Sequence, residues 1–360
     1  MESYKYTAII EWAKESIIDR GLISGDRFFS ETELCEIHNV SRQTVRQALA
    51  ILEREGIILR RQGSGTFVQA QSRHSDEKTV TVGLISTYFS DYIFPSIITG
   101  IEQVLKKNHI NLQISTTHNQ VTEEARALRA MLSQDIDGLI VEPSQSGLPS
   151  LNAEIYNEIR LRNIPLVFFN AKYPESSFPY VAMDDITAGR IAADHLIACR
   201  HRKISAIFLL DDIQGHLRYK GFMKSLLASG VSAPENRVMW FSSQDRDEIM
   251  SVYEKKLLNL LADSTGIVCY NDYLAVELLE FCKQHGINVP VDVSIVGIDD
   301  AKRAGICEVP LTTVQHPKQE LGKKVAEVLL QLIANPNEEI ADVIFEPKLV
   351  ERASVKLIPT

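Results

Sequence analysis

Four side chains that can hydrogen-bond to DNA lie close together in one short segment, at Arg42, Gln43, Thr44 and Arg46. Arginine can donate two hydrogen bonds to guanine, glutamine can pair with adenine, and threonine can contact a thymine methyl group. Ser41 precedes them and is a typical helix N-cap, and the N-terminus of a helix favours phosphate. The segment therefore has the chemistry expected of a recognition helix in the major groove.

A second set of polar side chains follows the predicted strands of the later part of the chain. Together with Phe94, the set comprises Ser86, Tyr88, Asp91, Tyr92, Glu142, Asn170, Asp184, Asp185, Asp211, Asp212, Gln214, His216, Arg218, Asn271, Asp272, Asp299, Asp300, Gln315 and His316. Carboxylates, amides and an arginine beside aromatic rings suit a polyhydroxylated sugar. Single members could instead be structural: Asp185 and Asp272 could cap helices, and Asn170 could sit in a turn.

Residue patterns of common enzymes are missing from the sequence. It has no Walker lysine motif, no nucleophile elbow and no metal-type spacing of His and Cys. The five cysteines are scattered without CxxC spacing, which argues against a zinc site and against a disulfide framework. We therefore predict no catalytic residue, metal or cofactor, although the Asp pairs leave an enzyme acting on a sugar as a less favoured alternative.

The length and net charge of the chain further limit the number of domains and the class of protein that can be expected. A chain of 360 residues predicts two or three domains, and the net charge of −9 argues against general binding to polyanions. Residues 42–61 nevertheless carry five basic and two acidic side chains, so positive charge is expected on one face; a protein-interaction module remains the alternative. No leader and no run of about 18 apolar residues is found, so we expect a cytoplasmic protein without a membrane span.

The first domain is predicted at residues 1–70. A helix with apolar residues such as Ile9 and Trp12 at helical spacing ends near Gly21. Ser30 and Glu33 form a capping box for a short second helix, whose Leu34 and Ile37 are expected to face inward. The third helix follows Ser41 with a buried stripe of Val45, Ala48, Leu49 and Leu52. Two strands, 57–61 and 66–68, are expected around a glycine-containing tip.

Residues 71–79 are predicted to be a polar linker, and residues 80–360 a second domain in which strands and helices alternate. Expected strands are 80–86, 112–115, 138–141, 166–170, 204–209, 237–241, 266–270 and 294–298, and expected helices are 95–108, 122–134, 155–162, 187–198, 217–229, 246–262 and 274–285. Such alternation predicts parallel sheets covered by helices. A break near Tyr180 divides the domain into two lobes, with a ligand expected in the cleft at the carboxyl ends of the strands.

The first domain resembles the GntR family of winged-helix repressors. The resemblance rests on FSETEL at 29–34, VSRQTVRQAL at 40–49 and QGSGTFV at 62–68, although Phe29 replaces the family's usual proline. It implies a winged helix-turn-helix fold. It also implies DNA contacts from Arg42, Gln43, Thr44 and Arg46, from Gln62 and Gly63 in the wing, and from Lys5 in the first helix. We include Ser30 among the predicted DNA contacts.

The second domain resembles the LacI/GalR sensor domain, which is itself similar to periplasmic sugar-binding proteins. The motifs are DGLIVEP at 137–143, DDITAG at 184–189, RHRKI at 200–204, YND at 270–272, VPVDVSIVGIDD at 289–300 and PLTTV at 310–314. The family's usual glycine before His201 is Arg200 here. The resemblance implies three crossings between the lobes, near Tyr180, Thr312 and Asp342. It also implies ligand contacts from Tyr92, Glu142, Asp184, Arg218, Asn271, Asp299 and Gln315, to which we add His216.

The combination of the two domains is similar to the arabinose-responsive repressors of the AraR type, especially at YFSDYIFPSII (88–98) and DVIFEP (342–347). The resemblance implies a homodimeric repressor that binds double-stranded operator DNA and releases it when a sugar, expected to be L-arabinose, enters the cleft. Another pentose or a hexose is the alternative effector. An extracellular sugar-binding protein is disfavoured by the DNA-binding segment and the missing leader.

Overall fold

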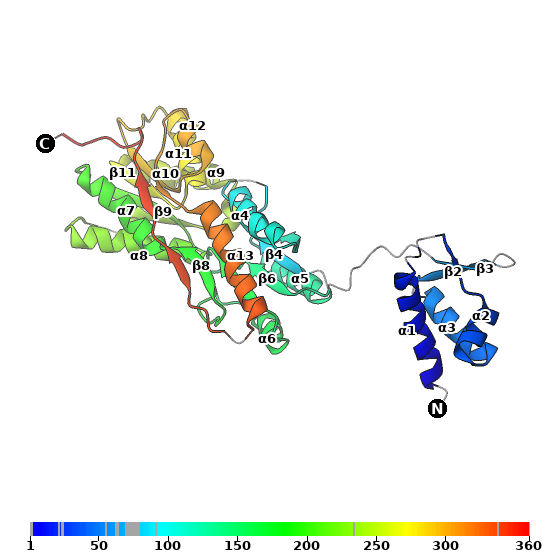
Figure 1. The fold of residues 1–360 in the computed structure, drawn as a ribbon. Coiled ribbons are helices and arrows are strands. Elements are labelled where there is room, and N and C mark those ends of the chain that lie inside the picture. Colours follow the sequence, from blue (N-terminus) through cyan, green and yellow to red (C-terminus); the bar gives the residue numbers. More distant parts are fainter. Residues whose placement is uncertain are drawn as a thin grey trace. The chain divides into compact units, whose positions relative to one another are not determined.

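The chain forms two compact units, Met1–Lys78 and Thr79–Thr360. In the computed structural model, the described residues are 3–20, 22, 25–54, 56–61, 65–68, 80–90, 92–232, 235–336 and 338–359. The predicted linker 71–79 and the tip of the predicted wing, with Gln62 and Gly63, lie outside these residues. Figure 1 labels the helices and strands of each unit.

The first unit combines three helices with a small antiparallel sheet. Its elements are α1 (Ser3–Asp19), β1 (Arg27–Phe28), α2 (Glu31–His38), α3 (Arg42–Arg54), β2 (Ile58–Arg61) and β3 (Gly65–Val68). The strands pair in the order β1-β3-β2. This confirms the predicted winged helix-turn-helix fold. Strand β1 was not predicted, because two residues are too short to show an alternating pattern.

One hydrophobic core holds the helices of this unit together. The predicted stripe of α3 is confirmed, since Val45, Ala48, Leu49 and Leu52 are fully buried. The inward position predicted for Ile37 is wrong: its side chain is 48% exposed. It lies in the last turn of α2, close to Asn39 in the left-handed conformation, and Leu34 is the fully buried residue of α2 while Cys35 packs against the core partly buried.

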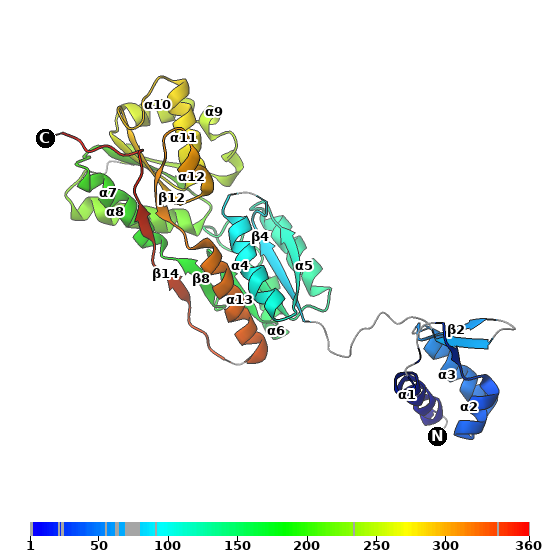
Figure 2. The same cartoon turned by 45° about the horizontal axis from the view of Figure 1, so that its top comes forward.

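The second unit contains two parallel-stranded lobes (Figure 2). Lobe 1 has the sheet order β14-β8-β7-β6-β4-β5. Its elements are β4 (Thr81–Ser86), α4 (Phe94–Lys107), β5 (Asn111–Thr116), α5 (Val121–Leu132), β6 (Gly138–Val141), α6 (Ala153–Leu161), β7 (Leu166–Phe169), β8 (Tyr180–Met183), α13 (Lys318–Ala334) and β14 (Val343–Phe345). Helices α4 and α13 share one core with the sheet, and α5 and α6 share another.

Lobe 2 has the sheet order β10-β9-β11-β12-β13-β15, in which only β15 is antiparallel to its neighbour. Its elements are α7 (Asp185–Ala198), β9 (Ile204–Leu209), α8 (Ile213–Ala228), η1 (Glu235–Arg237), β10 (Val238–Phe241), η2 (Ser243–Asp245), α9 (Ile249–Val252), α10 (Glu254–Ala262), β11 (Gly266–Cys269), α11 (Asp272–Gln284), β12 (Ser294–Asp299), α12 (Lys302–Ile306), β13 (Thr312–Gln315) and β15 (Lys348–Val350). The single helix predicted at 246–262 is wrong. The chain breaks at Tyr253, whose backbone (φ −109°, ψ 18°) leaves the helical region.

The chain crosses between the lobes from β8 to α7, from β13 to α13 and from β14 to β15. These crossings lie beside the positions predicted near Tyr180, Thr312 and Asp342.

In lobe 1, α4 and α13 lie side by side (Figures 1 and 2) and approach closely at two glycines. A Cβ atom on Gly100 would lie 2.2 Å from the Gln319 carbonyl oxygen, and one on Gly322 would lie 2.1 Å from that of Ile97.

Candidate functional site

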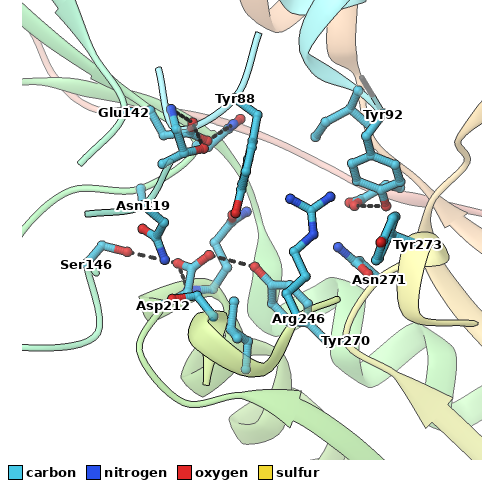
Figure 3. A pocket seen from close by; sticks show the side chains of 18 of the residues that line it. Tyr88, Tyr92, Asn119, Glu142, Ser146, Asp212, Arg246, Tyr270, Asn271 and Tyr273 are labelled. Atoms are coloured by element: carbon cyan, nitrogen blue, oxygen red, sulfur yellow. Dashed lines mark hydrogen bonds between the residues drawn. The ribbon is translucent and has the colours of Figure 1, made fainter. Parts of the chain in front are cut away.

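A cavity between lobe 1 and lobe 2 collects side chains from the carboxyl ends of the strands of both sheets. The space between its lining atoms is about 870 Å³, part of it open to solvent. Lobe 1 contributes Thr87, Tyr88, Tyr92, Ile93, Phe94, Asn119, Glu142, Pro143, Ser146, Asn170 and Ala171, and lobe 2 contributes Leu209, Asp212, Gln214, Arg218, Phe241, Ser243, Arg246, Tyr270, Asn271, Tyr273, Leu274 and Asp299. Polar groups and aromatic rings face one another across it (Figure 3).

Glu142 is the main carboxylate on the lobe 1 side. It follows β6 and accepts hydrogen bonds from the Thr87 amide (2.9 Å), the Thr87 hydroxyl and Asn170 Nδ2 (2.7 Å). Burial raises the pKa of Glu142, while these donors oppose the rise. The other polar atom of the same amide group, Asn170 Oδ1, is buried and has no hydrogen-bond partner among the described residues. This part of the cavity can therefore accept a hydrogen bond from a bound molecule.

Arg218 is the central cation on the lobe 2 side and is 2% exposed. Its Nε lies 2.7 Å from Asp185 Oδ1, its Nη1 donates to the Tyr270 carbonyl at 2.6 Å, and its Nη2 lies 3.3 Å from Asp299 Oδ1. Burial raises the pKa of Asp185 to about 6 even though Arg218 opposes the rise. Burial likewise raises the pKa of Asp299. The guanidinium group of Arg218 thus directs these hydrogen bonds to other residues of the protein and not into the cavity space.

Several hydrogen bonds join the lobes at the cavity. The Tyr92 hydroxyl of lobe 1 donates to Asp299 Oδ2 at 2.5 Å. On the opposite side, Ser146 Oγ donates to Asp212 Oδ1 at 2.8 Å, and the Tyr270 hydroxyl donates to Asp212 Oδ2 at 2.6 Å. Figure 3 shows Ser146 and Asp212 facing each other. These contacts connect the two lobes across the cavity.

Several cavity residues have an unusual backbone conformation. Tyr92 (φ 61°), Asn119 (φ 57°), Asn170 (φ 61°) and Asp299 (φ 114°) all lie at positive φ. Such conformations are uncommon for residues other than glycine and often occur at binding sites. Because each residue ends a strand or lies in the loop after one, the strained positions place polar side chains at the cavity.

The cavity brings together Tyr92, Glu142, Arg218, Asn271 and Asp299 from the predicted ligand set. The other three predicted residues lie outside its lining. Asp184 caps α7 by accepting from the Thr187 amide at 2.9 Å. His216 Nε2 donates to the Leu210 carbonyl at 2.6 Å and its ring lies 5.2 Å from that of Trp240, and Gln315 is an exposed residue at the end of β13.

Further lining residues were not singled out from the sequence: Thr87, Ile93, Asn119, Pro143, Ser146, Ala171, Leu209, Phe241, Ser243, Arg246, Tyr270, Tyr273 and Leu274. Asn119 and Arg246 could have been predicted from the sequence, because they follow the strands β5 and β10. The strand-end rule that selected Glu142 and Asn271 applies equally to those two strands.

The first unit presents the predicted DNA-binding residues at the start of α3. Arg42, Gln43 and Arg46 are exposed, and Thr44 is half-buried. Arg46 Nε pairs with Glu31 Oε2 at 3.0 Å. Ser30 forms the predicted capping box, in which its hydroxyl accepts from the Glu33 amide at 3.3 Å. The side chain of Lys5 lies outside the described part of the chain, as do Gln62 and Gly63.

Within the described ranges, no cluster of three or more His, Cys, Asp or Glu side chains is arranged to hold a metal ion. No helix in the same ranges is long and apolar enough to cross a membrane.

Comparison with known proteins identifies the family. Residues 5–68 match the model of bacterial regulatory proteins of the gntR family, and residues 193–355 match a periplasmic binding protein-like domain. The arabinose metabolism transcriptional repressor of Geobacillus stearothermophilus is 37% identical, with 97% of this chain and 96% of the relative covered. The protein of the same name from Halalkalibacterium halodurans is 36% identical at the same coverage. The chain belongs to this repressor family.

The repressor therefore joins a DNA-binding GntR-type domain to a sensor of the LacI type, and it is a sugar-responsive regulator rather than an enzyme. A solved structure similar to the sensor is the periplasmic binding protein/LacI transcriptional regulator from Alkaliphilus metalliredigens, in complex with D-xylulofuranose. It is 25% identical with a TM-score of 0.67, and the comparison covers 77% of this chain and 99% of the other.

Proposed function

We propose that L-arabinose binds in the interlobe cavity of this repressor and releases it from operator DNA. The names of its relatives support arabinose, and the sugar bound to the Alkaliphilus metalliredigens regulator supports a site for a small sugar. The observation that carries the proposal is Asn170 Oδ1, a buried acceptor at the cavity without a donor among the described residues. A buried acceptor left unpaired costs about 1–3 kcal/mol, and a sugar hydroxyl would supply the missing donor.

We assign the effector contacts to Tyr92, Glu142, Arg218, Asn271 and Asp299, which all line the cavity. Glu142 can accept from sugar hydroxyls, and Asn271 can both donate and accept. Arg218 differs from the others, because its three described hydrogen bonds already go to Asp185, Asp299 and the Tyr270 carbonyl. Its role toward the sugar is mainly to hold Asp299 in place.

For the DNA side, we propose a homodimer in which two first domains (1–70) bind the halves of a pseudo-palindromic operator. Arg42, Gln43, Thr44 and Arg46 would contact the major groove, with further contacts from Lys5, Ser30, Gln62 and Gly63. The polar segment 71–79 would link each domain to its sensor. We place the repressor in the cytoplasm, where operator DNA is accessible to it.

The proposal is tested by selecting a binding sequence from a random DNA library with the full chain and then measuring its affinity by fluorescence anisotropy. L-Arabinose should weaken binding, whereas D-xylose, D-ribose and D-glucose at the same concentration should not. Asn170→Ala should require more L-arabinose for half-release, with unchanged affinity for DNA in its absence. Release by a different sugar would reassign the effector, and no response to any of them would reject the proposed site.

A further inference from the structure

Arg246 lines the cavity and lies against two aromatic rings. Its guanidinium carbon lies 4.3 Å from the ring centre of Tyr88 and 4.3 Å from that of Tyr273. Figure 3 shows the guanidinium group between the two rings. Both distances are within the range of cation–π attraction, which strengthens when the groups are shielded from water. All three side chains line the cavity and are half-buried.

The three residues belong to different lobes, and this gives their contacts different roles. Arg246 and Tyr273 are both in lobe 2, after β10 and in the first turn of α11. Tyr88 follows β4 in lobe 1. If the lobes separate, the contact between Arg246 and Tyr273 stays within one lobe, whereas the contact between Arg246 and Tyr88 must break. Tyr273 therefore orients the guanidinium group, and Tyr88 makes the contact between the lobes.

Each partner is held in place by its own lobe. The segment before Arg246 is fixed by the Ser243 amide, which donates to Asp211 Oδ1 at 3.0 Å. The Tyr273 hydroxyl donates to Asp247 Oδ1 at 3.3 Å. On the other lobe, the Tyr88 ring lies 5.7 Å from the ring of Phe94. Because the Tyr88 and Tyr273 rings are already positioned within their own lobes, formation of the contact costs less conformational entropy than it would between unrestrained side chains.

We propose that Arg246 is a clamp residue that holds lobe 1 closed over the bound effector through the face of the Tyr88 ring. This inference rests on the proposed function and adds a specific role to it. Arg246 stabilises the arrangement in which the lobes are close together, and it thereby sets how long the sugar stays bound. The polar cavity residues determine which sugar is recognised, while the clamp acts after the sugar has entered. Its loss should therefore change the dissociation rate constant far more than the association rate constant.

The experiment measures L-arabinose association and dissociation on the full chain by surface plasmon resonance. Arg246→Ala and Tyr88→Leu should each raise the dissociation rate constant by about 5- to 30-fold, equivalent to about 1–2 kcal/mol. Tyr88→Phe removes the hydroxyl but keeps the ring face, so its dissociation rate constant should be lower than that of Tyr88→Leu by at least about fivefold. Arg190→Ala, which removes an exposed arginine of α7 paired with Asp194, is the matched control for loss of a positive charge.

A second readout separates failure of the clamp from failure of the proposed function. The distance between two fluorophores, one on each lobe, is followed by energy transfer without sugar. Arg246→Ala and Tyr88→Leu should widen the distance distribution, and Tyr88→Phe should not. If the wild type binds no sugar, the proposed function fails, and the distance between the fluorophores alone tests whether Arg246 holds the lobes together. Equal distances and equal dissociation rates in Tyr88→Leu and Tyr88→Phe would overturn the clamp.

Discussion

Replacing Arg218 with methionine should destabilise the sensor as well as disturb the cavity. Methionine keeps an unbranched apolar side chain but leaves Asp185 and Asp299, which are 2% exposed each, without their cation. Removing one partner of a buried ion pair costs about 3–5 kcal/mol. For a unit of about 280 residues, an unfolding entropy of roughly 2.1 cal/mol/K per residue converts this loss into a fall in Tm of about 5–8 °C.

The pH dependence of this loss has a definite sign. The pKa of Asp185 is raised by burial to about 6, above the value near 3.9 expected in an unfolded chain. A carboxyl group with a raised pKa stabilises the folded state in its protonated form, and that contribution is lost as the pH rises through the folded pKa. Without Arg218 the pKa should rise further. The deficit of Arg218→Met should therefore be larger at pH 8 than at pH 5.

Calorimetry of wild type, Arg218→Met, Asp185→Asn and the double variant measures the coupling between the two side chains. Removing the carboxylate charge of Asp185 in the Arg218→Met background should recover at least about 1 kcal/mol, because the effects of side chains in direct contact are not additive. Two single effects that add within about 0.5 kcal/mol would refute the reasoning. The same data matter for function, since loss of sugar response in an Arg218 variant would not by itself identify a direct sugar contact.

Three further substitutions test other parts of the molecule. Gly100→Ala should lower the free energy of unfolding by about 1–3 kcal/mol in urea, since its methyl group would meet α13, whereas Gly305→Ala, with no atom nearer than 3.9 Å, should not. Ser30→Ala should cost the first domain about 1 kcal/mol through loss of the cap, and a changed salt dependence of DNA binding would instead assign Ser30 to DNA contact. Glu31→Gln should tighten DNA binding by up to about tenfold and steepen its salt dependence, as it frees Arg46; weaker binding would contradict the predicted DNA-binding face.

The fold was largely predictable because its elements have clear sequence patterns. The stripe of α3 repeats at helical spacing, and the buried strands β6 and β9 are short, mostly apolar runs. Strand β1 depends on pairing with the distant strand β3, and the break at Tyr253 accompanies a hydrogen bond from its hydroxyl to Asp245; local periodicity reports neither contact. The same limit applies to cavity residues in loops, such as Ser146, which reaches the site through contact with Asp212 of the other lobe.

The three predicted ligand residues that lie outside the cavity lining have simple local reasons for their positions. His216 and Arg218 are two positions apart on α8, which is about 200° around a helix, so one side chain can face the cavity only if the other turns away. Asp184 and Asp185 are neighbours, and the first caps α7 while the second binds Arg218. Gln315 is the last residue of β13 and is exposed, although Val314 and the two threonines before it are buried. These residues were recognisable in the sequence, but only the packing shows which side chains line the cavity.

In the proposed function, Asp299 would connect effector recognition to the movement of the lobes. Its carboxylate accepts from Tyr92 of lobe 1 and pairs with Arg218, while its backbone carbonyl accepts from Lys318 Nζ at 2.6 Å, at the start of α13. Its φ of 114° shows that the surrounding contacts hold an unfavourable backbone conformation. A ligand that binds this carboxylate must therefore compete with a contact to lobe 1 or reinforce it, and in both cases it favours one arrangement of the lobes. Such a difference in affinity between two states is what a ligand needs in order to shift the equilibrium between them.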